Sequence, residues 1–322
     1  MMLGQPAASG PAGFAAGDMT GGASSNLDRL SAGAFRWIRD NLEFFDPASA
    51  PELPATQRVQ AALEVALLCL AWGRHRPEND GLGDVTAFVR EIWQRPEFPQ
   101  LVAAHPSYAQ RYGLVYGALA PAGMTNGSHR AVLARLAADG YLASCGKSPY
   151  LRLETRYYAD LAGVGHEIES YAELYASGIL AKLKTPLSIT ENDAYEITHT
   201  IFYLSDFGSR DARLARDDRE RVHRIVCLLT DHFVQRDQWD LVGEFILAQF
   251  CLGGNPLETP SGVAGIERLQ EVQLPDGAIP GATAKRRPEK SATAAEFFQE
   301  AYHTTLVTGL ATLMIASGCR DS

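Results

Sequence analysis

Apolar residues recur every three or four positions along most of the chain, which is the spacing of one face of an α-helix. The same periodicity covers residues 81–95, 128–138, 166–183, 191–207 and 293–316. No segment shows the alternation that is typical of a half-buried strand, so the pattern predicts an all-α protein. The three clearest apolar faces are Val59, Ala62, Leu63, Ala66, Leu67 and Leu70; Val222, Ile225, Val226, Leu229 and Phe233; and Leu241, Phe245, Ala248 and Leu252.

Prolines and glycines divide these segments into many helices of about 12–18 residues with short connections, which favours paired layers of antiparallel hairpins over a four-helix bundle. Thr190 and Asp193 have the spacing of a capping box, so the helix over 191–207 is expected to begin there. We expect one helical domain over residues 27–322. Residues 1–26 are rich in Gly, Ala and Ser and are expected to form a disordered tail.

Charge and composition exclude several classes of function. The chain has 322 residues, of which 46% are hydrophobic, and its net charge of −9 argues against binding to nucleic acid or to an anionic membrane. No apolar run is long enough to span a bilayer. Five scattered cysteines without a CxxC pair indicate a reducing, cytoplasmic location. Because GxGxxG, P-loop and GxSxG motifs are missing, no nucleotide cofactor is expected.

A short motif, E-x-x-H-T, occurs in two of the predicted helices. It places Glu196 three residues before His199, and Glu300 three residues before His303. This spacing puts each carboxylate beside an imidazole on a largely apolar helix face. A shared metal or acid–base site is one explanation. The other is a pair of core histidines, each bonded locally to a carboxylate or carbonyl.

Glu244 strengthens the first explanation, because it interrupts an apolar face where an unpaired carboxylate is costly. The candidate metal ligands are therefore His199, His303 and Glu244, holding a divalent ion such as Zn or Fe. Aromatic side chains near the two histidines, which suit substrate contact, are Tyr195, Tyr203 and Tyr302. A chain order of Glu169 or Glu173, Glu196 with His199, Glu244, and Glu300 with His303 is also that of di-iron carboxylate proteins.

The last 50 residues resemble protein prenyltransferase β-subunits and terpenoid cyclases. Residues 302–304, Tyr-His-Thr, and the apolar run to Leu310 are similar to a prenyltransferase helix in which the histidine is a zinc ligand. Residues 273–281 are similar to the Q-x-x-D-G turn of the same fold. The resemblance implies a single-domain α/α toroid and places His303 in a metal site. The Asp and Cys ligands of the prenyltransferases and the D-x-D-D motif of the cyclases have no counterpart here.

The resemblance implies a cytoplasmic enzyme that acts on a small biosynthetic intermediate in a central cavity. The expected reaction is transfer or cyclisation with loss of a leaving group, for which Arg286 and Arg287 are candidate anion ligands. One alternative is a Glu/His metal oxygenase. Another is a non-catalytic helical subunit that binds a partner or assembles as a homo- or hetero-oligomer.

Overall fold

The computed structural model describes residues 17–49, 51–78, 81–124, 127–183, 189–281 and 293–320. Within these ranges every regular element is helical and no residue lies in a strand, which confirms the all-α prediction. The elements in chain order are α1 (Gly17–Asp40), η1 (Leu42–Phe45), α2 (Ala55–His75), α3 (Gly83–Gln94), α4 (Phe98–Val102), α5 (Pro106–Ala118), α6 (Gly127–Ala138), α7 (Pro149–Ala162), α8 (Tyr171–Ser177), α9 (Ile179–Lys182), α10 (Glu191–Ser205), α11 (Arg216–Val234), α12 (Trp239–Cys251), η2 (Pro256–Glu258), α13 (Pro260–Val272) and α14 (Ala294–Arg320).

The capping box at the start of α10 is present. The Thr190 hydroxyl accepts a hydrogen bond from the Asp193 amide at 3.2 Å, and the Asp193 carboxylate accepts from the Thr190 amide at 2.8 Å. The expected helix over 166–183 is instead two short helices, α8 and α9. Ser170 and Glu173 form a second capping box that delays the start of α8, and the extended backbone of Gly178 separates it from α9.

Helix α1 begins at Gly17 and so includes residues 17–26, which the composition had assigned to a disordered tail. Leu27 and Leu30 are buried, and α1 packs on α13 and α14. A helix anchored by this packing extends towards its N-terminus at little further cost, since each added residue gains a hydrogen bond and no proline intervenes. Residues 1–16 of the expected tail lie outside the described residues.

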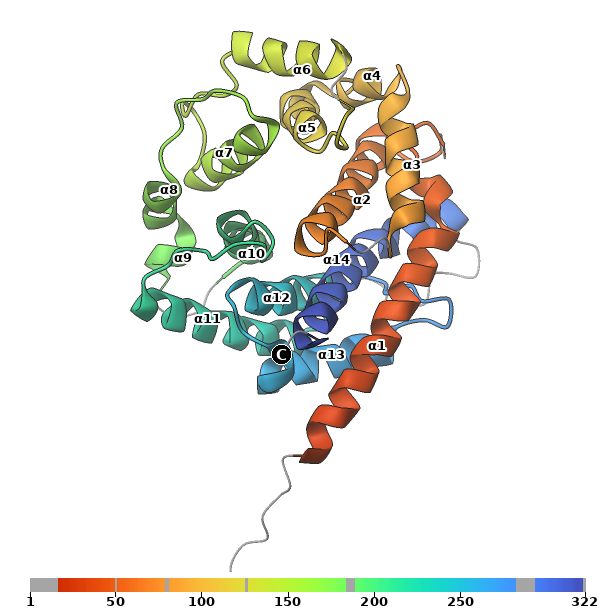
Figure 1. Ribbon diagram of the computed structural model, residues 1–322, viewed down its shortest axis with the longest axis vertical. Helices are drawn as coiled ribbons and strands as arrows, with labels where there is room; N and C mark the ends of the chain where they lie inside the picture. Colours follow the sequence, from red (N-terminus) through yellow and green to blue (C-terminus); the bar gives the residue numbers. More distant parts are fainter. Residues whose placement is uncertain are drawn as a thin grey trace, which may run out of the picture.

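Six helices contact one another in cyclic order. Helix α2 contacts α5, α5 contacts α7, α7 contacts α10, α10 contacts α12, α12 contacts α14, and α14 returns to α2. Figure 1 shows these six around the centre of the view, with α1, α3, α6, α8, α11 and α13 on their outer side. The outer helices pack on this ring: α3 on α2, α6 on α5, α8 on α7, α11 on α12, and α1 on α14. Side chains of the six inner helices that point inward therefore approach a common centre.

Helix α12 is the most enclosed of the six. Nearly all of its residues are buried, because it contacts α10, α11, α13 and α14 at once. Gly243 allows the closest of these contacts, since a Cβ there would lie 3.1 Å from both Thr308 Oγ1 and Val307 Cγ1 of α14. A polar residue in α12 therefore has no access to bulk water and must find its partners on neighbouring helices.

The Q-x-x-D-G turn after α13 attaches that helix to α1. The Gln273 amide donates hydrogen bonds to the Leu30 and Gly277 carbonyls at 3.0 and 3.1 Å. Gly277 has a φ of +101°, and a Cβ at this position would lie 2.0 Å from the Gly33 carbonyl oxygen. Only glycine fits this turn, because both the backbone conformation and the close approach to α1 exclude a side chain.

We predict that Gly277→Ala lowers the free energy of unfolding by about 2–4 kcal/mol, since it combines positive-φ strain with a backbone clash. Gly163→Ala is the matched control. Gly163 ends α7 with a φ of +66° and has open space around its Cα, so strain alone should cost about 1 kcal/mol. Urea denaturation of both variants measures the difference, and equal losses would contradict the close approach.

Candidate functional site

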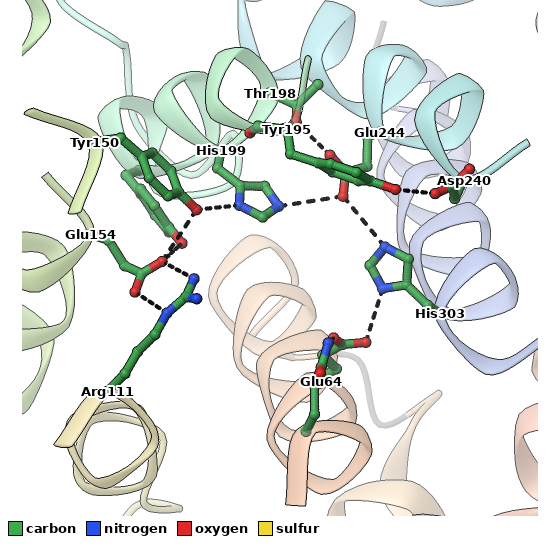
Figure 2. A network of polar contacts seen from close by, with 12 residues as sticks. Glu64, Arg111, Tyr150, Glu154, Tyr195, Thr198, His199, Asp240, Glu244 and His303 are labelled. Atoms are coloured by element: carbon green, nitrogen blue, oxygen red, sulfur yellow. Dashed lines mark hydrogen bonds and ion pairs between the residues drawn. The ribbon is translucent and has the colours of Figure 1, made fainter. Parts of the chain in front are cut away.

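Three of the predicted site residues meet at one point, although they come from three helices. His199 of α10 and His303 of α14 direct their Nε2 atoms at Oε1 of Glu244 in α12, at 3.3 and 3.5 Å (Figure 2). The Thr198 hydroxyl donates to the other oxygen of the same carboxylate. The two E-x-x-H-T segments therefore contribute to one site rather than two.

The carboxylate of Glu244 is ionised although it is only 1% exposed. Burial by itself raises the pKa of a carboxyl group, because the charged form loses its hydration. The charges and hydrogen bonds of His199 and His303 outweigh burial here and lower the pKa of Glu244 to about 2. Glu244 is therefore a fixed negative charge that both imidazoles share.

His303 lies between two carboxylates. Its Nε2 faces Glu244, and its Nδ1 lies 3.0 Å from Oε2 of Glu64 in α2. Only the imidazolium form can donate at both nitrogens. Burial opposes that charge, but Glu64 and Glu244 raise the pKa of His303 well above its usual value. The other oxygen of Glu64 accepts a hydrogen bond from Gln60 at 2.8 Å.

His199 has a different second partner, the phenol of Tyr150 in α7, whose oxygen lies 2.8 Å from Nδ1. The same hydroxyl lies 3.2 Å from Oε2 of Glu154. Tyr150 has one proton for these two acceptors. If it donates to His199, the imidazole is neutral and donates only to Glu244; if it donates to Glu154, the imidazole carries both protons. His199 therefore has two satisfied protonation states, as a group that exchanges protons requires.

An ion pair completes this side of the site. Arg111 of α5 binds Glu154 through two hydrogen bonds of 2.6 Å, from Nε and from Nη2. The Tyr203 hydroxyl also donates to Glu154, at 3.3 Å. Glu154 is buried, so this two-point contact with a guanidinium supplies the neutralisation that a buried carboxylate needs.

The network forms part of the wall of a cavity of about 460 Å³. All six helices of the inner ring line this cavity, and the polar network takes at least one side chain from each of them. Leucine, valine and phenylalanine side chains form most of the remaining wall. A volume of this size with a few convergent polar groups is typical of a small-molecule site.

Glu196 and Glu300 do not reach this site, although the motif paired them with the two histidines. Glu196 is half-buried and lines a separate, smaller cavity, and Glu300 is exposed. A spacing of three residues rotates a side chain by about 60° from its neighbour around the helix axis. That rotation is enough to turn each glutamate away from the interior while its histidine points into the cavity.

The predicted substrate-contacting aromatics are divided in the same way. Tyr203 lines the cavity. Tyr195 donates its hydroxyl to Asp240 and is absent from the cavity wall, and Tyr302 is buried against Phe45 and Phe298. The candidate anion ligands Arg286 and Arg287 lie outside the described residues.

Six residues of the network were not identified from the sequence: Gln60, Glu64, Arg111, Tyr150, Glu154 and Thr198. Glu64 follows Leu63 within an apolar stretch, so the criterion that singled out Glu244 would also have found it. Arg111 and Glu154 are partners from helices 43 positions apart, and no local pattern relates them.

In the part of the chain that the structure describes, no group of three or more His, Cys, Asp or Glu side chains was found in a metal-holding arrangement. In the same part, no helix combines the length and the hydropathy that crossing a bilayer requires.

Residues 31–313 match the family described as "Domain of unknown function (DUF6895)". The match covers most of the chain, which therefore belongs to this family. No curated protein matches the chain, and no solved structure does either.

We predict that the stability of the protein falls as the pH rises above neutrality. The folded-state pKa of His303 is raised, so its contribution is fully present below about pH 6.5 and is lost as the pH rises through the folded-state value. His303→Gln should remove this alkaline loss, as measured by urea denaturation between pH 6 and pH 9.

His105→Gln is the control for this experiment, because His105 is exposed just before α5 and its described side-chain contact is the ring of Tyr108. It should retain the alkaline loss of the wild type. An unchanged pH dependence in His303→Gln would show that the imidazolium between Glu64 and Glu244 does not contribute.

Proposed function

We propose that the protein is an enzyme that acts on a small molecule in the central cavity, with His199, Glu244 and His303 as its acid–base centre. The observation that carries the proposal is the meeting of two imidazoles from different helices at one buried carboxylate on the cavity wall. A structural role for either histidine requires only one local partner. Two imidazoles at one carboxylate with different second partners, Glu64 for His303 and Tyr150 for His199, favour proton transfer.

In this proposal His303 is the general acid. It is the imidazolium of the pair, and about a third of its side chain is exposed at the cavity wall. It can protonate a leaving group as the bond to that group breaks. His199 is the general base. In its neutral form Nδ1 accepts a hydrogen bond from the Tyr150 hydroxyl, so it takes up that proton as the hydroxyl receives one from the substrate. This assignment suits transfer or ring closure with loss of a leaving group, the reaction expected from the sequence resemblance.

The fold supports the same proposal. We infer that the cyclic contacts of α2, α5, α7, α10, α12 and α14 are those of the inner layer of an α/α toroid, with the remaining helices outside. In such a fold the inner helices surround a central cavity, and one side chain from each can take part in one site. A reducing cytoplasm is the proposed compartment, because four widely separated cysteines, Cys69, Cys145, Cys227 and Cys251, are unpaired.

A metal-dependent form of this site is the second candidate. The Nε2 atoms of His199 and His303 and Oε1 of Glu244 form a donor set that Zn and Fe prefer. Their separations of 3.3 and 3.5 Å are close to the roughly 3.4 Å between ligands of a tetrahedral ion with bonds of about 2.1 Å. Glu64 on Nδ1 of His303 would then orient a ligand. Such an ion would supply Lewis-acid chemistry.

Elemental analysis of protein purified without a histidine tag separates the two forms. The acid–base site predicts a metal content far below one ion per chain and unchanged after dialysis against a chelator. About one zinc or iron ion per chain, lost in both His199→Ala and His303→Ala, would replace the acid–base site by the metal site.

We predict that His303→Ala and His199→Ala each reduce activity by about 100-fold or more while the helical circular dichroism spectrum is retained. The double variant should be little worse than either single variant, because both histidines serve one centre. Turnover can be followed by mass spectrometry as depletion of a metabolite from an extract of the producing cells.

Glu300→Ala is the matched control, since Glu300 belongs to the same motif but is exposed. It should retain full activity. Losses that multiply in the double histidine variant would show two independent sites, and full activity of both single variants would remove the proposed centre.

A further inference from the structure

Carboxylates outnumber Lys and Arg side chains on the cavity wall. Three carboxylates line it, those of Glu64, Glu154 and Glu244. Arg111 is the one Lys or Arg among the described residues of the wall, and Glu154 holds it through two hydrogen bonds. The His303 imidazolium is shared between Glu64 and Glu244. The described wall therefore holds more carboxylates than Lys or Arg side chains.

Glu64 is the carboxylate at which this excess is available to a ligand. Glu244 is almost fully enclosed and Glu154 is neutralised by Arg111, whereas 22% of the Glu64 side chain remains exposed. Besides His303, its described partner is the neutral amide of Gln60. A cation placed beside Glu64 would gain more here than in water, because the surroundings screen the charge less.

Two aromatic rings lie on the same side of the cavity. Tyr112 donates its hydroxyl to Gln60 at 3.3 Å, which links it to Glu64. Tyr108 stacks on Tyr112 with ring centroids 5.3 Å apart, and both rings line the cavity. Tyr108 is 40% exposed, so a ligand can reach it from solvent. The electron-rich faces of tyrosine rings attract organic cations.

The remaining wall suits an uncharged part of the ligand. It consists mainly of apolar side chains, among them Leu67, Phe202 and Leu306. A diphosphate or another polyanion would have to lie among three carboxylates, and the only guanidinium on the described wall is already paired.

We propose that the cavity binds a small organic cation, an amine or ammonium compound with an apolar body, and that Glu64, Tyr108 and Tyr112 recognise its charged end. The inference rests on the proposed function only in taking this cavity as the substrate site. Substrates that carry a diphosphate are excluded from this site.

Calorimetric titration with three benzyl compounds of similar size tests the charge preference: benzyltrimethylammonium, benzyl alcohol and phenylacetate, with inorganic diphosphate as a fourth probe. We expect the dissociation constant of benzyltrimethylammonium to be at least about 10-fold lower than those of the other two benzyl compounds, and diphosphate not to bind. Tighter binding of phenylacetate or diphosphate would overturn the proposal, as would equal binding of the cation and the alcohol.

Two variants locate the binding. Glu64→Gln should weaken benzyltrimethylammonium binding about 10-fold and leave benzyl alcohol unaffected, whereas Glu91→Gln, an exposed glutamate of α3, should change neither. Tyr108→Leu provides a second test that does not depend on a buried charge, because the ring is largely accessible; it should weaken only cation binding. Cation binding that survives both Glu64→Gln and Tyr108→Leu would refute the assignment.

These titrations involve no turnover, so they can be told apart from tests of the proposed function. Fully active His199 and His303 variants would remove the acid–base centre and leave a measured preference for cations intact. Histidine variants without activity, together with a preference for anions, would support the centre and reject the substrate class.

Discussion

The burial of one carboxylate, that of Glu244, sets the conditions for the rest of the structure. An ionised group in the middle of α12 loses several kcal/mol of hydration, which only well-placed donors can offset. Those donors are Thr198 and His199 on α10 and His303 on α14. All three reach Glu244 only if α10 and α14 both pack closely on α12. Gly243, the residue before Glu244, permits this on the α14 side.

Each group that stabilises the charge of Glu244 needs a further partner of its own. The charge that His303 acquires beside Glu244 is stabilised by Glu64, which brings in α2. On the other side, Tyr150 connects His199 to Glu154 of α7, and Arg111 of α5 neutralises that carboxylate. The network therefore involves all six helices of the inner ring. Replacing buried ion pairs by apolar packing of the same volume is often neutral or stabilising, so the net stability of the fold does not by itself explain this network.

The three central residues of the network could be predicted from the sequence, because each is unusual in its local sequence context. Glu244, His199 and His303 are polar residues on apolar helix faces, and a helix pattern is enough to recognise that conflict. The all-helical class followed from the same periodicity. The partners were harder to predict. Glu64 and His303 are 239 positions apart, so only the closure of the ring brings them together.

Glu196 and Glu300 were included in the site because of their local spacing alone. Both are three residues from the histidines, but the rotation of about 60° between such positions is enough to turn the glutamates away from the cavity. The hydrogen-bond and ion-pair partners of the two histidines lie on other helices, not on the same helix. The start of α1 was misjudged for a related reason, because the packing of Leu27 and Leu30 on distant helices outweighs the composition of residues 17–26.

Sharing one carboxylate also couples the two histidines chemically. The charge of Glu244 helps to raise the pKa of His303, and the same carboxylate oxygen faces Nε2 of His199. In the proposed mechanism, an acid and a base that share one carboxylate change their protonation together. Glu64 and Tyr150 differentiate the pair, because one holds His303 in its charged form and the other allows His199 to be neutral. The asymmetry that the proposed acid–base chemistry needs thus arises from the second partners, which lie on α2 and α7, and not from the motif that the two histidines share.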